Sequence, residues 1–91
     1  GVGGSTARAL AGVLADLSAT HQVIVVSHLA QVAVMADKHY VVSKEPGDVP
    51  QTHLDEVTGE ARTAEIARML SGDQSEASLA HAKQMLEEAR G

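Results

Sequence analysis

Val23-Ile24-Val25-Val26-Ser27-His28-Leu29 is the stretch of this chain that decides its fold. Its four consecutive β-favouring apolar residues predict a strand over residues 22–27 that is buried on both faces, as in a parallel sheet. Parallel sheets place functional groups at the carboxyl ends of their strands. His28 stands at such an end. We therefore expect His28 to face a ligand or, on the simpler interpretation, to cap the helix that follows.

Helical and strand-like patterns alternate around this stretch. Apolar residues recur with helical spacing before and after it, and a second β-favouring run follows. The expected elements are a helix over 6–19, the strand over 22–27, a helix over 29–36 and a strand over 39–43. This order predicts an α/β fold in which parallel strands are flanked by helices. The expected caps of the first helix are Ser5 or Thr6, and its apolar stripe is Leu10, Val13, Leu14 and Leu17.

The second half of the chain predicts a turn, an edge strand and two C-terminal helices. Pro46-Gly47 has the order preferred at the centre of a type II turn. Residues 52–57 are polar and follow a proline, which favours an antiparallel strand at a sheet edge. The first of the two helices is expected over 61–70. The expected stop of that helix is Gly72, and the expected cap of the next helix is Asp73 or Ser75. The expected buried face of the last helix is Leu79, Ala82, Leu86 and Ala89.

Composition limits the chain to one small core. The 91 residues are 44% hydrophobic, and Tyr40 is the only aromatic residue. A formal net charge of −5 disfavours nonspecific binding of nucleic-acid phosphates through this segment. The absence of Cys excludes disulfides and thiolate metal sites. Because the sequence shows no apolar run of ~20 residues and no basic leader, we expect a soluble, unexported segment.

The histidines do not predict a metal site, and we expect none. They show no close paired spacing, and no Cys or carboxylate completes a ligand set. Ser27 and His28 suggest a nucleophile and its base. Adjacent strand residues point to opposite faces, however, so these two side chains are not expected to meet. The five histidines are His21, His28, His39, His53 and His81.

With the residues around it, the His28 stretch resembles part of a known ATPase family. In ABC-type ATPase heads, the Walker B strand is followed by the D-loop, a helix and a strand that ends in the H-loop histidine, and the order here is similar. More narrowly, the chain resembles the C-terminal part of the ATPase head of the RecN family of bacterial SMC-like DNA repair proteins. The similar runs are Gly1-Val2-Gly3-Gly4, Thr20-His21-Gln22-Val23-Ile24, Ser27-His28-Leu29-Ala30-Gln31-Val32-Ala33, Ile66-Ala67-Arg68-Met69-Leu70-Ser71-Gly72 and Ala80-His81-Ala82.

This resemblance implies a fold and a site. Residues 1–91 would form the C-terminal portion of one P-loop ATPase head, with the remainder of the D-loop, the H-loop and two closing helices. His28 would be the catalytic switch histidine, which contacts the γ-phosphate of ATP or orients the attacking water. Gly1, Gly3 and Gly4 would lie at the interface between two heads. Together with His28 they would bind ATP, which the full-length protein uses with Mg²⁺.

The chain departs from the family pattern in what it lacks. It has no Gly-x-x-x-x-Gly-Lys-Ser/Thr loop, no ABC signature segment, no Asp-Glu pair after a preceding apolar strand and no acidic D-loop residue. The first residue, Gly1, also predicts a fragment whose N-terminal lobe and coiled coil lie upstream, although tag removal or processing would leave the same start. By itself the fragment is expected to be inactive, because the loop that cradles phosphates is absent.

The function implied by the resemblance is ATP hydrolysis in the recombinational repair of DNA double-strand breaks. The implied partners are the rest of the same head, a second head in a homodimer, and DNA bound by the full-length protein, with no membrane. The implied location is the bacterial cytoplasm, at the nucleoid. Another ABC- or SMC-type head and a non-catalytic interaction module stay open as alternatives. Gln31 would support His28 or face water, and Arg62 and Arg68 would contact another part of the head or solvate their helices.

Overall fold

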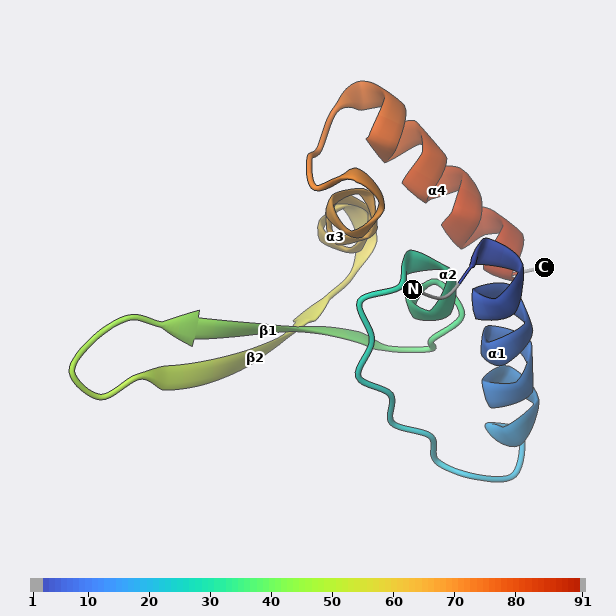
Figure 1. Ribbon diagram of the computed structural model, residues 1–91, viewed down its shortest axis with the longest axis horizontal. Helices are drawn as coiled ribbons and strands as arrows, with labels where there is room; N and C mark the ends of the chain where they lie inside the picture. Colours follow the sequence, from blue (N-terminus) through green and yellow to red (C-terminus); the bar gives the residue numbers. More distant parts are fainter. Residues whose placement is uncertain (1–2, 91) are drawn as a thin grey trace.

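The computed structural model describes residues 3–90 as four helices and one two-stranded antiparallel sheet. Figure 1 shows the helices gathered together and the hairpin projecting away from them. The protein is therefore a mixed helix-and-strand structure. The elements are α1 (Gly4–Leu17), α2 (Ala30–Ala33), β1 (His39–Glu45), β2 (Gln51–Val57), α3 (Gly59–Ser71) and α4 (Glu76–Arg90).

The core lies where α2, α3 and α4 meet. Ile66 and Ala67 of α3, Ala30 of α2 and Ala82 of α4 are buried in one cluster. The alanines let the helix backbones approach closely, so the larger side chain of Ile66 is enclosed completely. The predicted buried face of the last helix is confirmed, because its leucines border this cluster. The partly buried residues around it are Ala33, Val34, Met69, Leu70, Leu79, Met85 and Leu86.

The connection between α3 and α4 has the predicted stop and caps. Gly72 follows α3 with a φ of 77°, which glycine adopts without steric strain, and its N–H donates to the Arg68 carbonyl at 2.7 Å. The Asp73 carboxylate accepts the Ser75 N–H at 3.1 Å, and the Ser75 hydroxyl accepts the Ser78 N–H at 3.3 Å. These bonds satisfy amides at the start of α4. The hydrogen bonds that the Asp73 carboxylate accepts, chiefly from the Ser75 N–H and then from the serine hydroxyls around it, hold the pKa of Asp73 below its usual range.

The predicted antiparallel strand pairs with its neighbour to form the hairpin. β1 and β2 are in register from His39 opposite Val57 to Glu45 opposite Gln51. Residues 46–50 therefore form the connection, and Gly47 has a φ of 157°. A type II turn needs about +80° at this position. The predicted turn is thus not formed, because strand pairing continues to Glu45 and leaves a longer loop.

The hairpin is open to solvent along most of its length. Tyr40, Val42 and Leu54 are all exposed, although Val42 and Leu54 lie directly opposite each other in the ladder. Within residues 3–90 no third strand pairs with it. A two-stranded hairpin of this kind contributes little stability by itself. The stability of the chain must therefore come mainly from the helical core.

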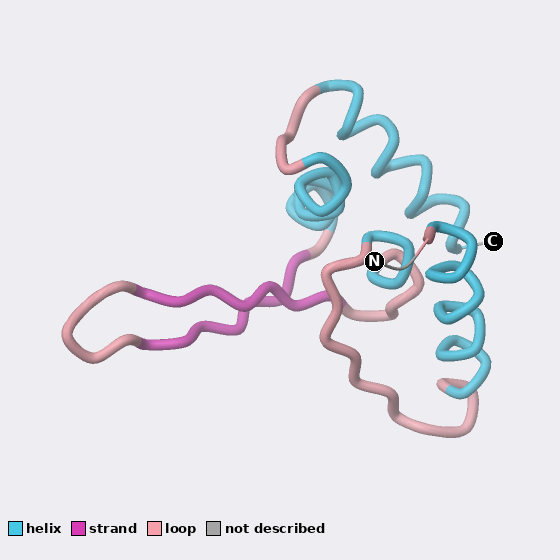
Figure 2. Tube along the Cα trace, viewed as in Figure 1, coloured by secondary structure: helices cyan, strands magenta, loops and turns pink. Residues whose placement is uncertain are grey.

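The strand predicted over residues 22–27 is not formed in this structure. Residues 22–29 contain no regular secondary structure, as the loop colour in Figure 2 shows, and Ile24 and Val26 are 84% and 97% exposed. A strand needs a neighbour whose backbone groups pair with its own. In the described part of the chain β1 pairs with β2 alone, so the expected parallel strands are absent there.

α1 packs through small residues and not through its predicted apolar stripe. Ala7 and Ala11 are buried, whereas Leu10, Val13 and Leu17 are exposed. The two alanines lie one turn apart on the same face, and their small side chains permit the close contact between α1 and α2. The predicted stripe is therefore wrong for three of its four residues, and only Leu14 is partly buried.

The two N-terminal helices also begin and end at residues other than those predicted. α1 begins at Gly4, so Ser5 and Thr6 lie within the helix and do not cap it. α2 ends at Ala33, and the chain continues through turns to Ala36, whose N–H donates to the Ala33 carbonyl at 3.2 Å. The second helix is therefore a single turn, shorter than the span predicted over 29–36.

We predict that Ile66→Ala lowers the free energy of unfolding of the 91-residue chain by about 2–4 kcal/mol. The change removes the one large side chain that the structure encloses completely within residues 3–90. Urea unfolding followed by far-ultraviolet circular dichroism measures the loss. Ile24→Ala is the matched control, because the same truncation at an exposed residue is expected to cost less than about 0.5 kcal/mol. Equal losses in the two variants would contradict this assignment of the core.

Candidate functional site

His28 stands at the corner where the extended segment turns into α2. The Ser27 hydroxyl accepts the Leu29 N–H at 3.0 Å, which closes the corner. Ala30 follows directly and is buried in the helical core. The His28 side chain itself is exposed, and no hydrogen bond to it occurs within residues 3–90. The corner thus presents an imidazole whose ring nitrogens are open to an external group.

The position of Ser27 also bears on the Ser–His alternative. Its hydroxyl oxygen is engaged with a backbone amide, and no Ser27–His28 hydrogen bond is present in the described structure. A nucleophile requires its base within hydrogen-bond reach. Ser27 therefore acts here as a support for the turn.

Arg62 of α3 reaches the opposite end of α2. Its Nη2 group donates to the carbonyl oxygens of Ala33 at 3.2 Å and Ala36 at 2.7 Å. The Ala33 carbonyl ends α2 and already accepts the Ala36 N–H, and the Ala36 carbonyl lies just beyond the helix. Carbonyls at this end of a helix favour a nearby cation. Arg62 is half-buried, and burial lowers the pKa of its guanidinium, although the group stays charged. The simple expectation that Arg62 only solvates its helix is therefore wrong.

His39 lies beside Arg62 at the start of β1. Burial lowers the pKa of His39 below its ordinary value of 6.5, the positive charge of Arg62 lowers it further, and Glu65 acts in the opposite direction. Nδ1 of His39 and Nε of Arg62 are both buried without a hydrogen-bond partner. Glu65 pairs with Arg68 on the same helix, and that hydrogen bond holds the pKa of Glu65 low. This junction therefore favours the neutral form of His39.

Two of the remaining histidines lie beside polar side chains close to them in the chain or across the hairpin. His21 Nδ1 lies 2.8 Å from the Thr20 hydroxyl, and His53 Nε2 lies 2.8 Å from a Glu45 carboxylate oxygen across the hairpin. His81 projects from α4. Over residues 3–90 no three potential metal ligands come together, and no helix there has the length and hydropathy to span a membrane.

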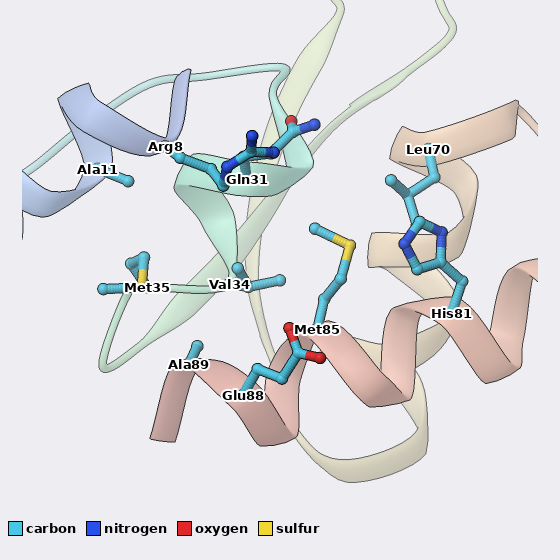
Figure 3. Close-up of a pocket in the computed structure, with 10 residues that line it drawn as sticks. All are labelled: Arg8, Ala11, Gln31, Val34, Met35, Leu70, His81, Met85, Glu88 and Ala89. Carbon is cyan, nitrogen blue, oxygen red and sulfur yellow. The ribbon is translucent and has the colours of Figure 1, made fainter. Parts of the chain in front are cut away.

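A pocket of about 410 Å³ lies between α1, the α2 segment, α4 and Leu70 of α3, and the sequence did not predict it. In the view of Figure 3, Arg8 and Gln31 lie at one side of it and His81 at the other, with Glu88 and Met85 projecting from α4. Gln31 therefore lines this pocket. Its residues come from separate helices, so no local sequence pattern relates them.

Gly3 and Gly4, the described part of the glycine-rich run, lie at the beginning of α1. Gly1 falls outside the described residues. Gly3 is the N-cap of α1, and a Cβ added there would meet no atom of the chain within 4 Å. A Cβ added at Gly4 would lie 3.5 Å from the Arg8 guanidinium, an ordinary contact. Packing inside this chain thus does not require glycine at Gly3, and the backbone there is open to approach by another surface.

The glycine start and the His28 corner belong to two helices that pack together. α1 contacts α2, and Arg8 and Ala11 of α1 line the same pocket as Gln31 of α2. No hydrogen bond in the described structure joins Gly3 or Gly4 to His28. Gly3, Gly4 and His28 therefore lie on or beside two helices that pack together, with no hydrogen bond between the glycines and His28.

These features define a mixed helix-and-strand segment that presents an exposed histidine corner and lacks a phosphate-cradling sequence of its own. No protein-family model matches the chain. Its relatives are DNA repair proteins named RecN. The protein of Deinococcus radiodurans is 49% identical over 87 residues, and that of Treponema pallidum is 49% identical over 88 residues, each match covering 94% of this chain. The Mycobacterium tuberculosis protein is 46% identical over 91 residues and covers 99% of the chain.

The chain is homologous to RecN and matches a fragment of the C-terminal region of these proteins. It spans about 15% of the length of the relatives just named. The resemblance stated from the sequence is thereby confirmed. The similarity covers nearly the whole chain, so the His28 corner, the hairpin and both C-terminal helices all lie within the matched region.

We predict that acid destabilises the chain through His39. Since the pKa of His39 is lowered in the folded state, the unfolded state takes up the proton first, and stability is lost as pH falls below the ordinary value of 6.5 and through the lowered folded pKa. Urea unfolding at several values between about pH 8 and about pH 5 measures this dependence. His39→Gln should reduce the loss, whereas His81→Gln, at an exposed position, should retain it. An unchanged pH dependence in His39→Gln would contradict the assignment.

Proposed function

We propose that this chain is the C-terminal portion of the ATPase head of a RecN-type DNA repair protein. In this proposal it supplies the H-loop histidine and the D-loop glycines to an ATP site formed between two heads. Identities of 41–49% to RecN proteins across 94–99% of the chain support the family part of the proposal. The observation that carries the site is His28, exposed at the start of α2 and without a hydrogen-bond partner in residues 3–90.

The chemistry of His28 follows from its imidazole. ATP, with Mg²⁺, supplies the phosphoryl group that water receives. A ring N–H of His28 donates to an oxygen of the γ-phosphate, or a ring nitrogen orients the attacking water. Imidazole suits this task because it can hydrogen-bond developing phosphoryl charge without the fixed charge of Arg. The open side chain fits the role, since no internal bond has to break first.

The glycine-rich start has a separate role in the proposal. Gly1, Gly3 and Gly4 lie at the interface between the two heads, where small residues let backbones approach the shared nucleotide. The open space at the Cβ position of Gly3 supports this assignment. The second head, in a homodimer, is therefore a partner of this part of the chain.

The exposed segment before His28 needs a partner of its own. We place residues 22–27 as a parallel strand in the sheet of the same head, next to the N-terminal lobe. Exposure of Ile24 and Val26 supports this, because a strand-favouring apolar run gains from neighbours on its edges and faces. The complete protein acts on DNA in recombinational repair of double-strand breaks, in the bacterial cytoplasm at the nucleoid.

We predict that His28→Ala in the full-length protein lowers steady-state ATP hydrolysis by about tenfold or more while nucleotide binding persists. The loss is expected because the γ-phosphate and the attacking water lose their hydrogen-bonding group. Turnover and nucleotide affinity are measured separately. His53→Ala is the control, since His53 lies on the hairpin and bonds to Glu45. Wild-type turnover in His28→Ala would remove the switch role from this residue.

We also predict that residues 23–26 are protected from amide hydrogen exchange in the full-length protein but not in the 91-residue chain. Strand pairing would protect their N–H groups, which have no ladder partner in the present structure. Mass spectrometry of peptic peptides measures the exchange. Peptides from α3 are the internal control, because their helical amides are bonded in both forms. Equally fast exchange of residues 23–26 in the two proteins would contradict the sheet assignment.

A further inference from the structure

We propose that Arg62 is a positioning residue, which holds α2 and thereby sets the orientation of the His28 corner for catalysis. This inference rests on the proposed role of His28 in ATP hydrolysis. It goes beyond that role because Arg62 lies on α3, far from His28 in the sequence, and acts through the backbone of α2. The residue touches neither the nucleotide nor the water in this proposal.

The need for such a residue follows from the weakness of the elements around His28. The segment before it forms no ladder, so it does not fix the corner within this chain. The helix after it contains four residues, Ala30–Ala33, and a helix of one turn is unstable without outside contacts. The orientation of His28 must therefore depend on what holds α2 in place.

Two kinds of contact hold α2 to the rest of the molecule. Apolar packing holds α2 against α1 and, through Ala30, against the Ile66 cluster, but contacts between small apolar groups are not directional. The directional contacts are the two hydrogen bonds from Arg62 to the carbonyls of Ala33 and Ala36. In the described structure these are the side-chain hydrogen bonds that join the α2 segment to another element. The Ser27 bond is local and moves together with the corner.

Holding Arg62 in this position costs free energy of desolvation. The guanidinium is partly withdrawn from water, and its Nε is buried without a partner. Leaving a buried donor unpaired disfavours the folded state. This cost is offset by the two charge-assisted hydrogen bonds that the Nη2 nitrogen donates to carbonyl oxygens at the end of α2. A flexible lysine would keep the charge but hold that pair of acceptors less rigidly.

The first test measures ATP hydrolysis by variants of the full-length protein. Arg62→Ala should lower kcat by about tenfold or more, because small displacements of a catalytic group are costly, while the KM for ATP changes by less than about twofold. Arg62→Lys should recover part of the loss. Arg68→Ala is the matched control, since Arg68 lies on the same helix and pairs with Glu65, away from α2, and it should behave as wild type.

The second test asks whether Arg62 acts through His28. In the His28→Ala background, Arg62→Ala should cause no further loss of kcat, because the group that it positions is gone. Losses that multiply in the double variant, or wild-type kcat in Arg62→Ala, would overturn the inference while leaving the role of His28 intact. Wild-type kcat in His28→Ala would overturn both. If Arg62→Ala does not fold, Arg62→Lys is compared in the two backgrounds with the same criteria.

Discussion

The enclosure of Ile66 between three helices is the interaction on which the rest of the structure depends. α3 supplies the side chain, and Ala30 of α2 and Ala82 of α4 close around it. Without this contact the single turn of α2 would pack against α1 alone, and the corner that carries His28 would lose its anchor to α3 and α4. The hairpin cannot replace it, because most of its side chains face water. A small core built from one isoleucine and several alanines therefore determines where the candidate site lies.

The chain divides into a packed part and an open part, and the candidate residues follow that division. α3 and α4 form the packed part, joined by Gly72 and the Asp73 cap network. The glycine start, the segment before His28 and the hairpin are open. Groups that meet a nucleotide or a second protein surface belong on the open side, because a buried group could not reach them. Arg62 connects the two parts, since it is rooted in α3 and bonds to the end of α2.

Features set by neighbouring residues could be predicted from the sequence, and features set by distant ones could not. The two C-terminal helices, the stop at Gly72 and both hairpin strands follow from local spacing and caps, and the structure contains them. The strand predicted over 22–27 is not formed, because a strand needs a neighbouring strand to pair with its backbone and the described residues offer none. α1 buries Ala7 and Ala11 because close approach to α2 favours small side chains over leucines. His28 was predicted at the end of that strand, and it stands instead where an irregular segment turns into α2. The hydrogen bond from Arg62 to Ala33, 29 residues away, corresponds to no local sequence pattern.

The position of Tyr40 determines what optical spectroscopy of this chain can detect. It is the only aromatic residue in the chain, and it lies on β1, away from the Ile66 cluster. Near-ultraviolet absorbance and intrinsic fluorescence of this chain therefore come from the hairpin and do not report directly on the helical core. A third strand or a protein surface that covers the hairpin would change the tyrosine emission without any change in helix packing. The molecule thus carries a single built-in optical probe at one of its uncovered surfaces.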